Sequence, residues 1–142
     1  MKTMMSDFPL HYSLNRVGLP LIITSSKPAL CFLIDTGASH NVLFSFVYAE
    51  LQYLFSALEP KSNTTIMGID GLTNNVCQVK GTIAFEGKQG ESIFSVMDAT
   101  EAISRVQKES GIQIHGILGI PFLVENKWIL DFDKLNIRTE QQ

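Results

Sequence analysis

The residues that could do chemistry begin with an acid, a hydroxyl and a glycine at 35–37. Asp35, Thr36 and Gly37 directly follow the apolar run CFLI at 31–34. A carboxylate at the end of a core strand is costly to bury unless it is paired or neutralised. Such a carboxylate can act as a general acid or base. The same residues would also make an ordinary tight turn after a strand. The tripeptide by itself leaves both interpretations open.

The residues for other kinds of catalysis are missing from the sequence. There is no HExxH motif, and His11, His40 and His115 are too scattered along the chain to indicate a metal site. Ser39 lacks the GxSxG setting of a nucleophile elbow. Neither a P-loop nor a GxGxxG motif occurs. We therefore expect neither a metal nor a cofactor.

The composition is that of an ordinary globular protein. The chain has 142 residues, which predicts one domain over 1–142. Apolar residues make up 45% and charged residues 18%, and a domain of this size can bury a sufficient core without a disulfide or a metal. The net charge is -3 and no Lys/Arg cluster is present. We therefore expect no nucleic-acid partner and no membrane-surface partner.

The compartment is predicted from the cysteines and the apolar segments. Cys31 and Cys77 lie far apart and outside any CxxC motif, so two free thiols are favoured over a disulfide. The N-terminus has no apolar run long enough for a secretion signal. The longest uncharged stretch, 110–124, is too short to cross a bilayer. These features predict a cytoplasmic protein, with the loss of a leader sequence as the alternative.

The hydrophobic pattern predicts mostly short strands. Apolar residues at helical spacing predict a helix over 41–58, and a second helix is predicted over 99–109, ended by Gly111. Glycines within 64–76 predict a hairpin. Strands are expected over 8–14, 19–24, 29–34, 76–85, 92–97, 127–132 and 136–139, with a turn at 87–90. So many short strands predict a mainly β barrel or sandwich.

The order of the motifs is more specific than any one of them. DTGAS at 35–39 is followed by the glycine-tipped hairpin and then by GILG at 116–119. This set resembles the retropepsin-like aspartic proteases, the single-domain relatives of retroviral proteases and pepsin. GILGIPFLVENKWILDF at 116–132 is similar to a GILGxxFL…DF pattern of the bacterial members. The resemblance covers about 19–138. It implies a mainly β, closed-barrel acid protease fold with two or three short helices and a flap hairpin.

The resemblance also implies roles for the residues of the first motif. Asp35 would be the catalytic carboxylate. Thr36 would form hydrogen bonds across two active-site loops, and Gly37 would let the backbone turn close to the substrate. Ala38 and Ser39 would line the floor of the cleft.

Two further segments are implied to bind substrate. The tip of the flap, expected to close over a peptide, comprises Gly68, Ile69, Asp70 and Gly71. Ile117 and Leu118 would lie near the substrate pockets, with Gly119 behind the active-site loop.

The chain departs from the retroviral pattern at two positions. Retroviral members usually carry an acid two residues after the motif's glycine and an arginine just after the second glycine motif, and these two side chains pair. Ser39 and Ile120 occupy these positions here. Both charges are absent together, so neither is left without its partner. Recognition of the peptide backbone near Ser39 is then less well defined.

One Asp-Thr-Gly per chain implies a homodimer. Peptide hydrolysis without a metal or a covalent nucleophile needs one base and one acid, which two neighbouring carboxylates supply by sharing a proton. Asp70, Asp98, Asp131 and Asp133 lie outside any equivalent loop. The second carboxylate is therefore expected from Asp35 of a second chain.

The function that follows is an aspartic endopeptidase acting on a peptide or protein substrate, with apolar side chains flanking the cut. The alternative is a catalytically weak or inactive retropepsin-fold module for peptide binding or dimerisation, because a fold does not guarantee a function. The intact DTGA sequence favours the enzyme.

Overall fold

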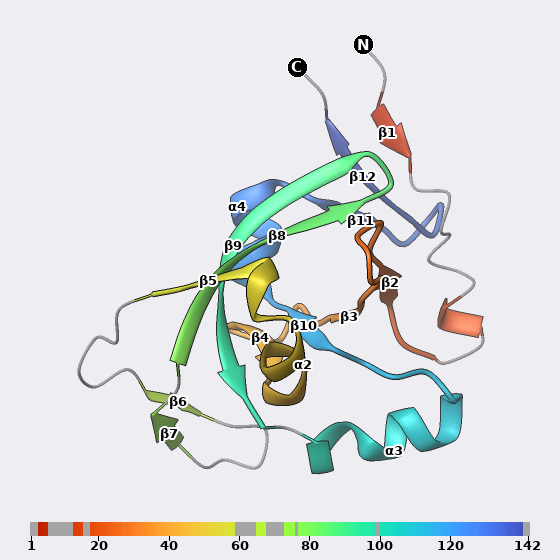
Figure 1. Ribbon diagram of the computed structural model, residues 1–142. Coiled ribbons are helices and arrows are strands. Elements are labelled where there is room, and N and C mark those ends of the chain that lie inside the picture. The colour runs from red at the N-terminus through yellow and green to blue at the C-terminus, as the bar shows by residue number, and fades with distance from the viewer. Residues whose placement is uncertain are drawn as a thin grey trace.

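The computed structural model describes residues 3–5, 13–15, 18–58, 65–67, 73–75, 77–98 and 100–140. Its main element is a seven-stranded sheet in the order β2-β3-β10-β4-β9-β8-β5. In that order the strands are Leu21–Ile23, Cys31–Ile34, Gly116–Leu118, Asn41–Phe44, Lys88–Met97, Cys77–Phe85 and Phe55–Ala57. Figure 1 shows β3, β10 and β4 gathered in the middle of the molecule, with the long β8–β9 ribbon curving over them.

Two smaller sheets and a few short helices complete the described structure. The first sheet has the order β1-β12-β11 (Thr3–Met5, Asn136–Glu140, Ile129–Asp131), and the second pairs β6 (Thr65–Met67) with β7 (Thr73–Asn75). The helices are α2 (Ser45–Glu50), the 3-10 helix η1 (Gln52–Leu54), α3 (Thr100–Ser110) and α4 (Ile120–Asn126). None of these helices is long and apolar enough to cross a membrane.

The mainly β class is confirmed, whereas barrel closure stays a prediction. The seven-stranded sheet ends at β2 on one side and at β5 on the other, and no sheet among the described residues closes on itself. The predicted strand 29–34 is present as β3, and the final hairpin is present as β11 and β12. The second predicted helix is also present, and Gly111 follows it with a positive φ of 73°.

The prediction of one helix over 41–58 was wrong. The segment forms β4, α2, η1 and β5 in turn. All four residues of β4 are buried, and the strand lies inside the sheet, with β10 on one side and β9 on the other. A short apolar run buried on both faces has no alternation, so its periodicity does not distinguish a strand from a helix. The first predicted strand, 8–14, falls mostly outside the described residues, and residues 13–15 are helical.

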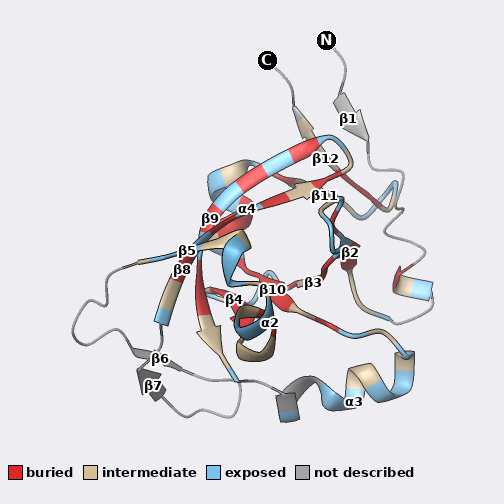
Figure 2. Ribbon diagram, viewed as in Figure 1, coloured by how far each residue is buried: buried red, intermediate tan, exposed pale blue. Residues whose placement is uncertain are grey.

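The long hairpin turns earlier than predicted. Strand β9 begins at Lys88, so the turn consists of Glu86 and Gly87, which both have positive φ (52° and 77°). Such a two-residue turn matches the twist of the flanking strands. Buried and exposed residues alternate along β8 and β9 (Figure 2), so one face of the ribbon meets the core and the other meets solvent.

The core is formed by residues of β2, β3, β4 and β10 together with this ribbon and helix α4. Phe122 of α4 is fully buried, and its ring meets Trp128 edge-on with centroids 5.0 Å apart. Phe94 of β9 packs against Phe32 of β3 at 6.0 Å. The Phe32–Phe94 contact holds β3, which leads to the candidate site, against β9, and the Phe122–Trp128 contact holds α4 against the segment that follows it.

Candidate active site

Asp35 directly follows the last residue of β3 and lies beside the end of a second buried strand, β10. Strand β3 runs parallel to β10, with Phe32 opposite Gly116 and Ile34 opposite Leu118. The Asp35 N–H then donates to the carbonyl oxygen of Leu118 at 2.9 Å. The backbone at Asp35 is thus still held by the sheet, while its side chain is half-buried at the surface. The structure therefore holds this carboxylate at a defined place where a ligand could reach it.

The loop after Asp35 folds back on the carboxylate. The Ala38 N–H donates to the carbonyl oxygen of Asp35 at 3.1 Å, and the Gly37 N–H donates to Asp35 Oδ1 at 2.9 Å. A Cβ added at Gly37 would lie 3.3 Å from that same oxygen, which is a tight contact. Glycine therefore allows the backbone to approach the carboxylate and to orient it.

The remaining residues of the first motif lie on the same loop. Thr36, Gly37 and Ser39 are exposed, and Ala38 is half-buried against the core. Ser39 Oγ lies within hydrogen-bond distance, 2.9 Å, of Nδ1 of His40. The predicted hydrogen bonds of Thr36 involve a second chain and stay a prediction.

The second glycine motif lies directly behind this loop. Gly119 is buried, and a Cβ added there would lie 2.5 Å from the carbonyl oxygen of His40 and 2.7 Å from that of Ala38. The Ile120 N–H donates to the same Ala38 oxygen at 2.9 Å. Only glycine fits this close approach of two backbones. The motifs at 35–39 and 116–119, far apart in sequence, therefore form one structural unit.

Ile117 and Leu118 belong to the core behind the loop. They are 4% and 0% exposed, respectively. The structure therefore brings them next to Asp35 through the backbone of β10, and their predicted contact with substrate stays a prediction. Ile120, by contrast, is 41% exposed. Its N–H bonds to the Ala38 carbonyl oxygen, so position 120 lies beside the loop that carries Ser39.

The predicted flap corresponds to the hairpin β6–β7. Thr65 pairs with Asn75, and Met67 pairs with Thr73, in an antiparallel ladder. This pairing supports a hairpin over 64–76. Its tip lies outside the described residues, and with it Gly68, Ile69, Asp70 and Gly71. Their predicted contact with substrate stays a prediction.

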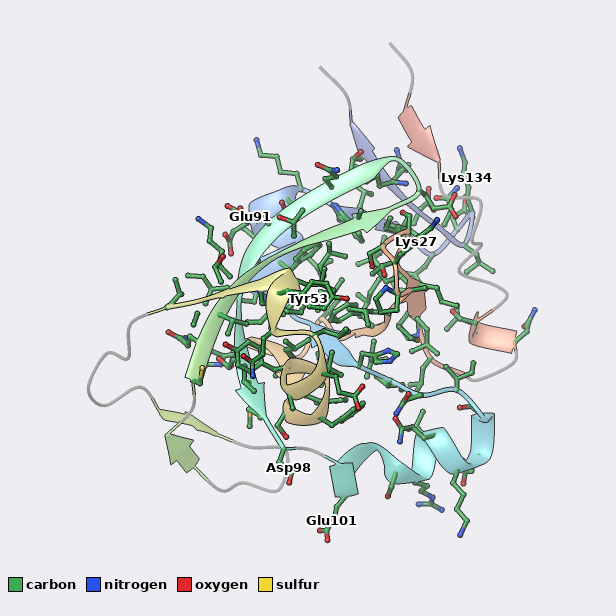
Figure 3. All side chains as sticks on the ribbon, viewed as in Figure 1. Lys27, Tyr53, Glu91, Asp98, Glu101 and Lys134 are labelled. Atoms are coloured by element: carbon green, nitrogen blue, oxygen red, sulfur yellow. The ribbon has the colours of Figure 1, made fainter. Side chains whose placement is uncertain are left out.

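Acidic side chains elsewhere in the described structure do not gather into a second site. Figure 3 shows Asp98 and Glu101 at the lower edge, where β9 leads to α3, well apart from Glu91 on the β8–β9 ribbon. Glu91 forms an ion pair with Lys80 at 3.1 Å. The described part of the chain holds no group of three or more His, Cys, Asp or Glu side chains that could bind a metal ion.

Three titratable groups near or behind the sheet have displaced pKa values. Burial raises the pKa of the Cys31 thiol to about 11, and Cys31 and Cys77 are both free. Burial also lowers the pKa of His115, whose Nδ1 accepts the Cys31 N–H at 2.9 Å. The backbone N–H of Lys134 lowers the pKa of Asp131. A buried thiol with a raised pKa is a poor nucleophile, so Cys31 is a core residue rather than a reactive one.

Sequence reasoning missed Asn41, which touches the second glycine motif. This side chain is 1% exposed. Its Oδ1 accepts the N–H groups of Gly119 at 2.9 Å and Phe122 at 3.2 Å. A polar residue directly before the apolar residues 42–44 was the available signal, because a buried amide must find partners.

Comparison with known proteins gives a likeness in structure alone. No protein-family model and no curated protein matches the chain. Among solved structures it is similar to the crystal structure of the retroviral protease-like domain of Ddi1 from Leishmania major, with 11% sequence identity and a TM-score of 0.54. The match covers 87% of this chain and 98% of that domain. The fold is therefore that of a retroviral-protease-like, or retropepsin-like, domain. A place among the bacterial members stays a prediction.

Proposed function

We propose that this protein is an aspartic endopeptidase whose active site is formed by Asp35 of two chains. The observation that carries the proposal is the position of Asp35 within a retropepsin-like fold. Its backbone is held to β10 through Leu118, and its carboxylate is oriented by Gly37 while remaining partly open to solvent. Fold and site together support acid–base chemistry at this carboxylate.

Two such carboxylates would act as the base and the acid of hydrolysis. At about 4 Å, and with an effective dielectric constant near 20, two ionised carboxylates repel by about 4 kcal/mol. One proton is therefore shared between them. The ionised carboxylate takes a proton from water as the water oxygen attacks the peptide carbonyl carbon, and the protonated one gives its proton to the carbonyl oxygen. Collapse of the tetrahedral intermediate breaks the C–N bond. The leaving amine takes the proton from the first carboxyl group, and a hydroxyl group of the intermediate gives its proton to the second carboxylate, which restores the shared proton.

The substrate of this proposed enzyme is a peptide in extended conformation. It would lie between the Asp35 loops and the two β6–β7 hairpins, which act as flaps and bind the substrate by strand addition. The alternative, a retropepsin-fold module that binds peptides or dimerises without useful turnover, is less well supported because the DTGA sequence is intact.

The test is the cleavage of a peptide library between pH 4 and 7, with wild type beside Asp35→Asn. We expect Asp35→Asn to lower kcat by about 10²–10⁴-fold, because an amide can neither accept nor share the proton. A hydroxyl-containing mimic of the tetrahedral intermediate should inhibit the wild type, and a chelator should have no effect. Activity of Asp35→Asn within tenfold of wild type would exclude the assignment. Loss of activity with a chelator, restored by added metal, would indicate a metalloenzyme instead.

A further inference from the structure

Asn41 is the first residue of β4 and lies between β10 and β9. Its side chain is 1% exposed. A carboxamide offers two N–H donors and an oxygen with two lone pairs. Each of these costs free energy in the core unless it has a partner. A buried asparagine six positions after Asp35 therefore needs a structural or functional reason.

All four hydrogen-bonding positions of this carboxamide are used. Oδ1 accepts the N–H groups of Gly119 and Phe122, at 2.9 and 3.2 Å. Nδ2 donates to Ser92 Oγ at 2.8 Å and to the carbonyl oxygen of Ile93 at 3.1 Å. A backbone N–H can only donate and a carbonyl oxygen can only accept, so these partners fix which end of the amide faces which way.

The bonding continues beyond the amide to the surface. Ser92 Oγ donates to Glu125 Oε1 at 2.9 Å. A carboxylate can only accept, so the hydroxyl proton points to Glu125 and its lone pair receives the Asn41 N–H. The donor and acceptor roles therefore agree along the series of hydrogen bonds from Gly119 through Asn41 and Ser92 to Glu125. Hydrogen bonds in such a series strengthen one another.

Two backbone hydrogen bonds join the two motifs of the active site, and the Asn41 network meets the second motif between them. The Asp35 N–H bonds to Leu118, and the Ile120 N–H bonds to Ala38. Between these two bonds, the Gly119 N–H bonds to Asn41. We propose that Asn41 is a positioning residue, which holds the Asp35 loop in register with the second glycine motif and so sets where the carboxylate points. This inference rests on the proposed aspartic protease function.

The test uses Asn41→Asp with Asn126→Asp as its matched control. In Asn41→Asp an oxygen replaces the donor that faces the Ile93 carbonyl oxygen, so the two oxygens repel and displace the side chain from Gly119 with little change in volume. Asn126 donates from Nδ2 to the carbonyl oxygens of Glu91 and Phe122, at 3.2 and 3.0 Å. It therefore also links α4 to β9, and none of its hydrogen bonds reaches the Asp35 loop. Both substitutions remove an amide donor to a backbone carbonyl oxygen of β9, that of Ile93 for Asn41 and that of Glu91 for Asn126.

We expect Asn41→Asp to lower kcat by about 10²-fold, since a displacement near 1 Å at a catalytic group has that effect. KM should change little because substrate binding does not involve Asn41. The active sites are counted by titration with a tight-binding hydroxyl mimic, and kcat is expressed per titrated site. All measurements are made below the melting temperature of each variant. A merely structural residue would reduce the number of titrated sites and leave kcat per site unchanged. Asn126→Asp should keep the wild-type kcat.

Ser92→Ala provides a milder second variant. It removes one partner of Nδ2 and leaves the bond from Gly119 to Oδ1 in place. We expect a smaller loss of kcat than in Asn41→Asp. This variant carries the test if Asn41→Asp does not fold, and a wild-type kcat per site in Ser92→Ala would then overturn the proposal.

Amide hydrogen exchange at Gly119 separates this inference from the proposed function. We expect exchange there to be faster in Asn41→Asp than in wild type and Asn126→Asp, whether or not the protein cleaves peptides. An inactive wild type with this exchange pattern would exclude the protease and keep the positioning contact. Unchanged exchange at Gly119, or an unchanged kcat per site in a folded Asn41→Asp, would overturn the role of Asn41.

Discussion

At the scale of single residues, His115 makes the stability of the sheet that leads to Asp35 dependent on pH. The Cys31 N–H donates to His115 Nδ1 at 2.9 Å, and the His115 N–H donates to the Cys31 carbonyl oxygen at 2.8 Å. The carbonyl oxygen of His115 accepts the Phe44 N–H at 3.0 Å. Protonation of Nδ1 would remove the acceptor of the Cys31 N–H. The neutral imidazole is therefore part of the bonding that joins β3 and β4 to the segment before β10.

This position predicts a loss of stability in acid. Burial lowers the pKa of folded His115 below its usual value of 6.5, so between the two values the unfolded chain binds more protons than the folded one. The contribution of His115 is then complete above about pH 6.5 and decreases as the pH falls through the pKa of the folded state. Urea unfolding from pH 5 to 8 measures it. As the pH falls, the free energy of unfolding should decrease less in His115→Gln than in wild type. If it decreases equally in both proteins, the pH dependence does not come from His115.

At the scale of elements, β10 decides the shape of the site. It lies between β3 and β4, parallel to the first and antiparallel to the second. Its end leads through Gly119 into α4, while the end of β3 leads into the Asp35 loop. Because the two backbones are in contact there, the loop takes its position from β10 and from the start of α4.

The contact predicts that Gly119→Ala damages both stability and catalysis. The added methyl group would meet two carbonyl oxygens at 2.5 and 2.7 Å, and relieving such overpacking costs about 1–3 kcal/mol. The loop must also shift, so kcat per folded molecule should fall. Gly111→Ala is the control. A Cβ added at Gly111 would meet open space, but the residue has a φ of 73°. The substitution should therefore lower the free energy of unfolding by about 1–2 kcal/mol and leave kcat unchanged. Equal kcat values in the two variants would show that the contact does not position the loop.

At the scale of the whole molecule, the proposed active site requires a second chain. Each chain has one Asp-Thr-Gly sequence, so the proposed dyad needs a symmetric dimer whose two-fold axis passes between the two Asp35 side chains. The Thr36–Ser39 loop would lie at this interface. Both ends of the chain meet in one sheet, where β1 pairs with β12 (Figure 1). The described residues of the two terminal segments are therefore already paired with each other within one chain.

The dimer predicts that specific activity depends on concentration. Activity per chain should fall on dilution through the dissociation constant of the dimer. Adding an equal amount of Asp35→Asn chains should reduce wild-type activity by about half once the chains have exchanged, because random pairing divides the wild-type chains equally between the two partners. Activity assays beside sedimentation measurements test both effects. A monomer that cleaves peptides at full specific activity would refute the shared dyad, and a monomer inactive at every concentration would favour the binding module.

The sequence by itself determined the features that depend on local patterns. The apolar run before Asp35 predicted β3, because a short apolar segment ending in turn residues is typical of a buried strand. The terminal hairpin and helix α3 followed from their turn residues and from the glycine after the helix. The order of the two glycine motifs predicted the retropepsin-like fold that the structural likeness supports.

Only the tertiary structure decided which elements meet and what the polar core residues do. Strand β4 was predicted as helix, because all four of its residues are buried, which leaves no local alternation. Asn41 and Gly119 are separated by 78 positions in the chain, yet they share a hydrogen bond. A side chain's own sequence neighbours do not specify such a partner, since long-range contacts arise only when distant strands pair. The network behind Asp35 could therefore be read only from the folded chain.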